Sequence, residues 1–385
     1  MSDPVTLATG ITYERECIER WMFSEKNNTC PVTKQWIYDD ELTPNNTLRR
    51  LIQAWCTANA SAGIERFPTP RAPVNKTDIL KLLKNASTDP QYQMDSLQKL
   101  RIIVLESDRN KHYVESTAGA IDMLISIIKR SIYSLESTSS SVCDEALMIL
   151  SSIQISDQGL LNLISKHEDL IDALTLLMHR SKYQTRVYAT LLLNSLIELI
   201  APARLMAIQD QLFKEIVKVL GDRISSKATK AALKILAMLC PWGRNRVKVV
   251  GAGAVSVLVD LLLEEPEKRA CELMLLVLDI LCGCAEGRAE IVGHAAGIAI
   301  VSKKVLRVSL AASEKAVRIL YSVSKFSPTP AVLQEMLSVG AVTKLCLVLQ
   351  VDCGLKTKEK AKEILRLHSR VWRNSPCLPP QYAVF

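Results

Sequence analysis

The sequence predicts a mostly α-helical protein in which a small α+β segment precedes a long stack of helices. Three observations lead to this prediction. Hydrophobic residues make up 48% of the 385 residues, enough for a sizeable core, while aromatic residues make up only 5%. Such a composition disfavours an all-β sandwich, which needs aromatic and β-branched strands. Long apolar segments also recur at a nearly constant spacing, whereas the first 57 residues hold three of the five tryptophans.

The first predicted domain covers residues 1–57 and begins with a short strand pair near residues 5–13. A helix is expected from about residue 14 to residue 23. One face of this helix is predicted to be apolar and buried, and it carries Cys17, Ile18 and Trp21. A loop covers residues 24–35.

A second helix is expected over residues 48–59, with Asn45 or Asn46 as its N-cap. Its apolar residues follow a 3–4 spacing at Leu48, Leu51, Ile52 and Trp55. Residues 58–75 form a predicted linker because their prolines and glycine break any periodicity. Residues 374–385 form a C-terminal tail.

Residues 76–373 are predicted to be helical repeats. Each repeat has an Ala or Leu that leads a long apolar helix, at steps of 42–45 residues: Ala146, Ala189, Ala231, Leu273, Ala316 and Ala361. A second recurring signal places a glycine before another apolar helix, at Gly119, Gly253, Gly297 and Gly340. A period of about 40–47 residues with two or three helices is typical of armadillo and HEAT repeats. We therefore expect about six units in a right-handed solenoid whose third helices line the concave face.

Few patterns in the chain indicate chemistry. Residues 251–256 resemble a dinucleotide-binding turn, but the sixth position is Ser, and Gly253 recurs with the repeat period, which favours a helix start. The five histidines and eleven cysteines lack the spacing of metal ligands. We therefore expect no metal, no cofactor and no covalent catalytic residue.

The charge and the termini suggest where the protein acts. The net charge of +8 is too small for a dedicated nucleic-acid binder, so no nucleic-acid partner is expected. Residues 356–373 hold seven Lys or Arg against Glu359 and Glu363. This stretch is either the solvated face of the last helix or a peripheral contact with an anionic membrane or acidic partner. The N-terminus lacks a signal peptide pattern, so the cytoplasm is expected, with the nucleus or a membrane surface as alternatives.

The first domain closely resembles the U-box of plant ubiquitin ligases. The residues that carry the resemblance are Asp3, Pro4, Val5, Gly10, Tyr13, Ile18, Trp21, Cys30, Pro31, Lys34, Gln35, Pro44, Asn45, Leu48, Leu51 and Ile52. The order of a U-box followed by armadillo repeats resembles that of the plant U-box/armadillo family. This resemblance implies a role in stress and defence signalling. The resemblance covers essentially the whole chain.

The resemblance implies a zinc-free, RING-like fold that docks a ubiquitin-conjugating enzyme carrying ubiquitin as a thioester. Trp21 and Pro31 match the family's apolar docking surface, and Lys34 or Gln35 matches the polar residue that bridges enzyme and ubiquitin. Catalysis would be positional, so a substrate lysine attacks without a covalent ligase intermediate. The alternatives are core packing for Trp21, a turn role for Pro31 and a solvated charge for Lys34. Cys17 and Cys30 are expected to be structural.

One departure from the family pattern concerns the N-terminus. The family has a further docking loop before Asp-Pro-Val, whereas this chain begins Met1-Ser2-Asp3-Pro4-Val5. We therefore expect an incomplete U-box, exposed Val5 and Leu7 side chains, and weak or absent ligase activity in vitro. The leading hypothesis is a ubiquitin ligase whose armadillo groove selects protein substrates. The alternative is a non-catalytic armadillo scaffold with an inactive U-box remnant.

Overall fold

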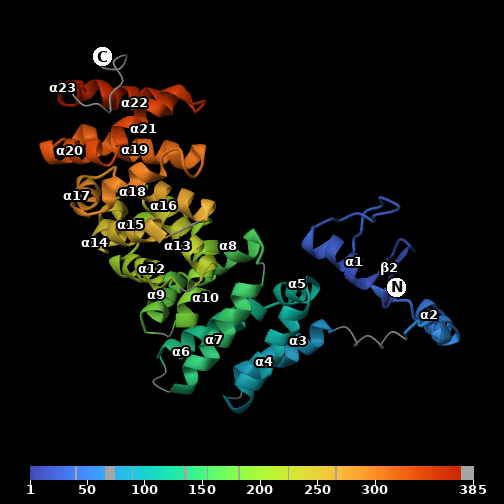
Figure 1. The fold of residues 1–385 in the computed structure, drawn as a ribbon. Helices are drawn as coiled ribbons and strands as arrows, with labels where there is room; N and C mark the ends of the chain where they lie inside the picture. Colours follow the sequence, from blue (N-terminus) through green and yellow to red (C-terminus); the bar gives the residue numbers. More distant parts are fainter. Residues whose placement is uncertain are drawn as a thin grey trace. The chain divides into compact units, whose positions relative to one another are not determined.

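The computed structural model describes residues 1–39, 41–65, 74–88, 90–133, 137–153, 155–180, 183–223, 225–264 and 267–373 (Figure 1). The chain forms two compact units, Met1–Gly159 and Leu160–Phe385, and each is described by itself. The predicted tail, and the prolines of the predicted linker, lie outside the described residues.

The first unit opens with a small antiparallel sheet in the order β2-β1-β3. Its strands are β1 (Pro4–Thr6), β2 (Thr12–Glu14) and β3 (Thr43–Pro44). Val5 pairs with Tyr13 on one side and with Pro44 on the other. The predicted strand pair is therefore confirmed, and a third strand from a distant part of the chain joins it.

The first predicted helix is shorter than expected. It consists of α1 (Arg15–Glu19) followed by a single π-helical turn, η1 (Arg20–Ser24). Ile18 is its buried residue, whereas Cys17 is exposed. The prediction that Cys17 lies on the buried face is wrong. Successive helical residues point about 100° apart, and the buried face is centred on Ile18, with Trp21 and Met22 one turn later.

The second predicted helix is α2 (Asn46–Ala58), followed by the 3₁₀ turn η2 (Ala60–Ala62). Its predicted apolar stripe is only partly covered, since Leu48 and Ile52 are half-buried. Leu51 and Trp55 are 63% and 58% exposed.

Asn45 joins α2 to the sheet. Its side-chain oxygen accepts a hydrogen bond from the backbone N–H of Leu48 at 3.0 Å, which makes it the N-cap of α2. Its Nδ2 donates to the hydroxyls of Thr6 on β1 and Thr12 on β2, at 3.3 and 3.2 Å. One side chain therefore sets the position of the helix relative to both strands.

Replacing Asn45 with alanine should destabilise the sheet and α2 together. The lost cap costs about 1–2 kcal/mol, and the two lost amide bonds add about 0.5–1.5 kcal/mol each. Hydrogen exchange should show faster opening at both Val5 and Leu48. Asn46→Ala, the neighbouring substitution without these bonds, is the control. Faster exchange confined to α2 in the Asn45 variant would contradict a joint role.

The remaining helices of the first unit are α3 (Lys76–Thr88), α4 (Pro90–Glu106), α5 (Asp108–Ser116), α6 (Ala120–Tyr133) and α7 (Ser137–Ser152). Helix α8 (Asp157–Lys166) contains the boundary between the units.

The described part of the second unit is helical throughout. Its helices are α9 (Leu170–Arg180), α10 (Tyr183–Ile197), α11 (Pro202–Met206), α12 (Asp210–Asp222), α13 (Ser226–Leu239), α14 (Asn245–Gly251), α15 (Ala254–Glu264), α16 (Lys268–Leu281), α17 (Ala285–Gly293), α18 (Gly297–Lys304), α19 (Leu310–Phe326), α20 (Pro330–Ser338), α21 (Ala341–Gln350), α22 (Leu355–Leu367) and α23 (Ser369–Trp372).

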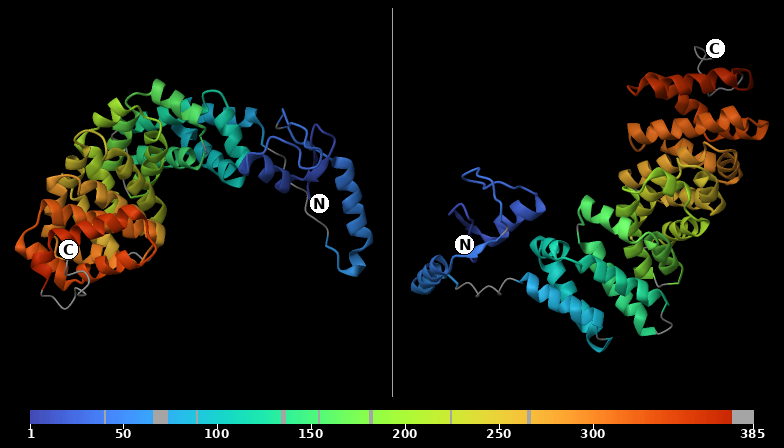
Figure 2. Two further views of the ribbon diagram at one scale, coloured as in Figure 1. Left: turned by 90° about the horizontal axis from the view of Figure 1, so that it is seen from above. Right: turned by 180° about the vertical axis from the view of Figure 1, so that it is seen from behind.

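The predicted repeat is confirmed by the third helix of each armadillo-type repeat. The six marker residues fall in α7, α10, α13, α16, α19 and α22, and each is at most 6% exposed. In the second unit α10, α13, α16, α19 and α22 pack successively against one another in one layer (Figures 1 and 2). Together with the recurring helices beside them, these helices form an armadillo-type solenoid, because each repeat buries its apolar face against its neighbours.

Polar contacts also join successive third helices. Arg318 on α19 pairs with Asp279 on α16 at 2.8 Å. The Tyr321 hydroxyl on α19 donates to the Glu363 carboxylate on α22 at 2.7 Å. These bonds fix the register between neighbours.

Three of the four recurring glycines form the turn that precedes a helix. Gly119, Gly253 and Gly340 have φ of 77°, 83° and 72°, the left-handed turn before α6, α15 and α21. The dinucleotide-like segment at Gly253 is therefore such a turn, as expected.

Among the described residues, no single helix is long and apolar enough to cross a membrane. Helices α20 and α21 meet that test only when they are taken together, and a bend of 65° separates them.

Candidate functional site

The core of the N-terminal domain consists of Val5, Leu7, Ile18, Cys30 and Leu42, each at most 3% exposed. The expectation that Val5 and Leu7 are exposed is therefore wrong. Residues distant in sequence, Cys30 and Leu42, cover them, and local patterns do not reveal such contacts.

Hydrogen bonds and an ion pair anchor the start of β1. Arg15 pairs with Asp3 at 2.5 Å, and the backbone N–H groups of Ser2 and Asp3 donate to the Glu14 carboxylate at 2.7 and 3.0 Å. Burial raises the pKa of Glu14, but these donors outweigh it, so that its pKa is lowered overall. The charged carboxylate thereby holds β1 on β2.

The predicted docking residues lie on α1–η1 and on a loop that folds back on itself. Thr29 and Trp36 form a β-bridge, and the Cys30 N–H donates to the Gln35 carbonyl at 2.8 Å. Lys34 adopts a left-handed φ of 58° at the tip. The structure thus gives residues 29–36, the docking loop, a defined hairpin-like shape.

Trp21 connects the helix to the docking loop. Its ring packs on the domain core, and its indole N–H donates to the Thr29 carbonyl at 2.8 Å. The side chain is half-buried, and so is Pro31, whereas Lys34 and Gln35 are exposed. The structure therefore places all four predicted residues on adjoining segments, with Trp21 contributing to the core as well as to the surface.

Two exposed apolar residues of this surface were not among the predicted docking residues. Val32 and Trp36 of the docking loop are 65% and 55% exposed. Their exposure follows from the loop's pairing, which leaves the Cys30 side chain inside and its neighbours outside. The available signal was the run Cys-Pro-Val-Thr-Lys-Gln-Trp, in which apolar residues flank the predicted docking positions.

Cys30 is the buried centre of the loop. Its sulfur lies 3.0 Å from the Tyr13 hydroxyl and 3.5 Å from the Thr9 hydroxyl and from the Thr33 N–H. Burial raises the pKa of the thiol, but the bonds from Thr33, Thr9 and Tyr13 outweigh it and lower the pKa from 9.0 to about 6. The sulfur is inaccessible, which agrees with a structural role.

The stability of this domain should therefore depend on pH. The pKa of Cys30 is lower in the folded than in the unfolded state, so its thiolate stabilises the fold fully above about pH 9. That contribution is lost as the pH falls to about 6. Hydrogen exchange of Val5 and Tyr13, corrected for the intrinsic rate, should show increasing protection from pH 6 to pH 9. Cys30→Ser should remove most of this slope, and an unchanged slope would contradict the assignment.

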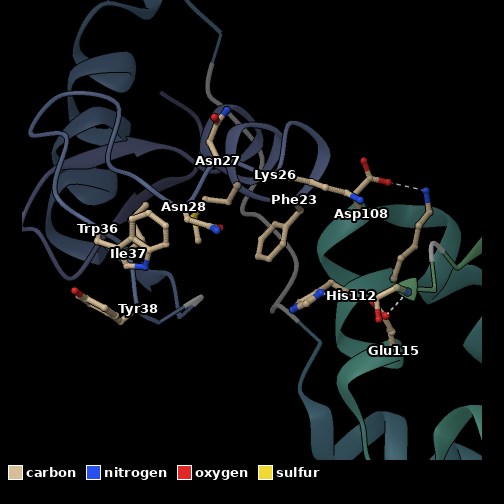
Figure 3. Close-up of a pocket in the computed structure, with 13 residues that line it drawn as sticks. Phe23, Lys26, Asn27, Asn28, Trp36, Ile37, Tyr38, Asp108, His112 and Glu115 are labelled. Atoms are coloured by element: carbon tan, nitrogen blue, oxygen red, sulfur yellow. Dashed lines mark hydrogen bonds and ion pairs between the residues drawn. The ribbon is translucent and has the colours of Figure 1, made fainter. Parts of the chain in front are cut away.

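Helix α5 contacts the end of η1 within the first unit. The Ser24 hydroxyl donates to Asp108 at 2.5 Å, and the Phe23 and His112 rings lie 5.7 Å apart (Figure 3). Arg109 pairs with Glu19 at 3.5 Å, and both side chains are largely buried. Burial raises the pKa of Glu19, an effect that Arg109 and Arg15 reduce.

A cavity of about 530 Å³ adjoins this contact. Figure 3 shows Phe23 and His112 on one side, and Trp36, Ile37 and Tyr38 on the other. Tyr38 is 92% exposed. The cavity thus lies between the docking loop and α5, and its lining mixes polar and apolar side chains.

The basic C-terminal stretch lies on α22 and α23. Lys356, Lys362, Arg366 and Arg370 are exposed, whereas the Lys360 ammonium lies 4.1 Å from the centre of the Tyr321 ring on α19. Glu363 pairs with Lys325 of α19 at 3.1 Å. Part of this charge therefore serves contacts between repeats.

Comparisons with known proteins agree with both parts of the chain. Residues 1–61 match the family model "U-box domain", and residues 78–383 match "Plant U-box protein ARM repeat region". An E3 ubiquitin-protein ligase of Arabidopsis thaliana, PUB23, is 52% identical over 384 residues, with 98% of this chain and 92% of the relative covered. The E3 ubiquitin-protein ligase PUB22 of the same plant is 48% identical over 408 residues, with 98% and 94% covered.

Among solved structures, the crystal structure of an engineered protein from the Northeast Structural Genomics Consortium matches with a TM-score of 0.54. It is 20% identical, and the match covers 77% of this chain and 69% of that one, which supports the fold alone. Both family models, and relatives that match along nearly their whole length, show the family. The chain belongs to the plant U-box proteins with an armadillo-repeat region, and it is a ubiquitin transferase of the U-box type.

Proposed function

We propose that the N-terminal domain docks a ubiquitin-conjugating enzyme on the surface formed by Trp21 and the docking loop. The observation that carries the proposal is the bond from the Trp21 indole to the Thr29 carbonyl, which fixes the helix and the loop as one surface. Val32 and Trp36 supply exposed apolar area beside Pro31. Aromatic anchors of this kind dominate the energetics of many interfaces.

Lys34 and Gln35 contribute the polar part of the proposed surface. Both are exposed at the loop tip, where they can donate hydrogen bonds to the enzyme and to the ubiquitin it carries. Restraining the thioester in one arrangement makes attack by a lysine effectively unimolecular. No residue of this chain forms a covalent bond in the proposed mechanism, in which the substrate lysine attacks the thioester directly. Cys30 is buried, and the exposed Cys17 is given no role.

The layer of third helices is proposed to select the protein substrate. Stacked repeats offer an extended surface on which the exposed side chains differ from one repeat to the next, while the buried Ala or Leu of each third helix stays apolar. The chain is proposed to act in the cytoplasm in stress and defence signalling. The exposed lysines and arginines of α22 and α23 are proposed as an additional contact with anionic surfaces.

The proposed function is tested by the discharge of ubiquitin from a charged conjugating enzyme. The full chain should accelerate transfer both to free lysine and to a protein target. Residues 1–75 alone should retain transfer to free lysine but lose target binding. No acceleration by the full chain would favour the alternative, a non-catalytic scaffold. Targets still captured by residues 1–75 would contradict selection by the repeats.

A further inference from the structure

The second unit contains a cavity of about 310 Å³ with a strongly positive lining. Four of the seven described lining residues are cations: Lys268, Lys303, Lys304 and Arg307. The others are Leu263, Val308 and Cys271, so no carboxylate is among the described lining residues. Lys268 is the first residue of α16, and Lys303 and Lys304 end α18 (Figure 1).

The described carboxylates near the cavity in sequence bind other groups. Glu264 pairs with Arg223, and Glu267 pairs with Lys230 at 2.5 Å. Glu272 accepts a hydrogen bond from the Ser309 hydroxyl at 2.7 Å. Each of these three carboxylates is therefore bound to a residue that is not among the described lining residues of the cavity.

The two helix ends do not neutralise this charge. Helix α16 begins with Lys268 and Arg269 and has no acidic residue in its first turn, and the side chain of its N-cap, Glu267, accepts no hydrogen bond from the N–H groups of the helix. Cations are unfavourable at this positive end of a helix. The C-terminus of α18 carries only about half a negative charge, against four cations. An anion in the cavity would relieve both effects.

One of the four cations, Lys304, is held in place by the fold, whereas the other three are exposed. Lys304 is more than nine-tenths buried, and its ammonium donates to the Cys271 sulfur at 3.4 Å. Leu306 has a left-handed φ of 58°, and its N–H donates to the Ser313 hydroxyl at 2.9 Å. This strained turn lies directly between Lys304 and Arg307 and directs the chain into the wall of the cavity.

The positive potential extends to α21. The pKa of Lys344 is lowered by burial and further by Arg307 and Lys303. Its ammonium donates to the Ser302 carbonyl at 2.7 Å. A fifth cation therefore lies within the field of the cluster.

We propose that this cavity binds a phosphorylated serine or threonine side chain of a protein substrate. The inference rests on the proposed function, in which the repeats select substrates. A phosphomonoester carries nearly two negative charges and three acceptor oxygens, which suit an arginine and several lysines. The volume is at the lower end of the ~300–1,000 Å³ typical of small-ligand sites, which fits a single phosphorylated residue. Leu263 and Val308 give the lining an apolar part that suits the side chains adjacent to the phosphorylated residue.

The test uses the full chain and an oriented peptide library with one fixed phosphoserine. Binding is compared with the same library carrying serine or aspartate, by fluorescence anisotropy. We expect the phosphoserine library to bind at least about tenfold more tightly than the serine library, and less tightly at high salt. Inorganic phosphate should compete with it.

The matched variants remove two cations each. Lys303→Gln with Arg307→Gln should reduce phosphopeptide binding at least about tenfold. Lys214→Gln with Lys218→Gln, exposed on α12, should not. All four positions are exposed, and thermal melting checks folding.

Equal binding of the serine and phosphoserine libraries would overturn the proposal, and so would an equal loss in both double variants. Binding to vesicles with phosphatidylinositol 4-phosphate, or to inorganic phosphate, without binding to the phosphopeptide would overturn it as well. Ubiquitin discharge to free lysine is recorded separately on the wild-type chain. A chain that discharges ubiquitin but ignores the phosphopeptide refutes this inference and leaves the ligase function intact.

Discussion

Replacing Trp21 with alanine should reduce ubiquitin discharge from the conjugating enzyme by roughly 30- to 1,000-fold. The removal of a central interface anchor typically costs about 2–4 kcal/mol, and each 1.4 kcal/mol is a factor of ten in affinity. Trp21 also fixes the docking loop through its bond to Thr29, so its loss misplaces Pro31 and Lys34. The measurement is the initial rate of transfer to free lysine at subsaturating ligase.

Two variants separate docking through Trp21 from covalent catalysis through a neighbouring thiol. Cys17→Ser changes an exposed residue of α1, one turn before Trp21, and should leave the rate unchanged. Trp21→Phe keeps an aromatic ring but loses the indole donor, and should cost about 0.5–1.5 kcal/mol. Full activity of Trp21→Ala would contradict the docking surface. An inactive Cys17→Ser that still binds the charged enzyme would instead indicate a covalent mechanism.

Hydrogen exchange of β1 distinguishes lost docking from lost folding. Trp21 packs on the core that contains Val5, so the alanine variant loosens the domain to some degree. If protection of Val5 persists while discharge is lost, the effect lies at the surface. Lys34→Ala, at the exposed loop tip, should lower discharge without any change in exchange.

The repeat region could be predicted because its signal is local and periodic. The six marker residues occur every 42–45 positions and are all buried, and from α10 to α22 each third helix packs on the next one. Asn45 was likewise one of two expected caps, since an Asn before an apolar helix is a strong N-terminal signal.

The N-terminal domain was harder to predict because its core depends on contacts between distant residues. Val5 is covered by residues that lie far along the chain, and Cys17 misses the buried face by one helical position. The exposed stripe at Leu51 and Trp55 shows the converse, an apolar 3–4 spacing that this structure leaves partly uncovered. Periodicity identifies a face, but it does not show whether anything packs on it.

Gly297 shows a further limit of the repeat pattern. It occupies the position of Gly119, Gly253 and Gly340 in the sequence signal, yet its φ is not left-handed. It is instead the first residue of α18, and a Cβ there would lie 1.9 Å from the backbone carbonyl oxygen of Ile291 on α17. Glycine is thus required for a left-handed turn in three repeats and for close helix packing in the repeat that contains Gly297.

Gly297→Ala should therefore destabilise the second unit. The obstacle is a backbone atom, so α17 and α18 must separate, and overpacking of this kind costs about 1–3 kcal/mol. At about 2–4 °C per kcal/mol, the melting temperature should fall by roughly 2–12 °C, measured by circular dichroism. Gly293→Ala, four residues earlier at the end of α17, is the matched control, because its Cβ would meet no atom within 4 Å. That control should be neutral or slightly stabilising, since alanine favours the helix. Equal melting of both variants would mean that α17 and α18 do not approach as closely as this packing requires.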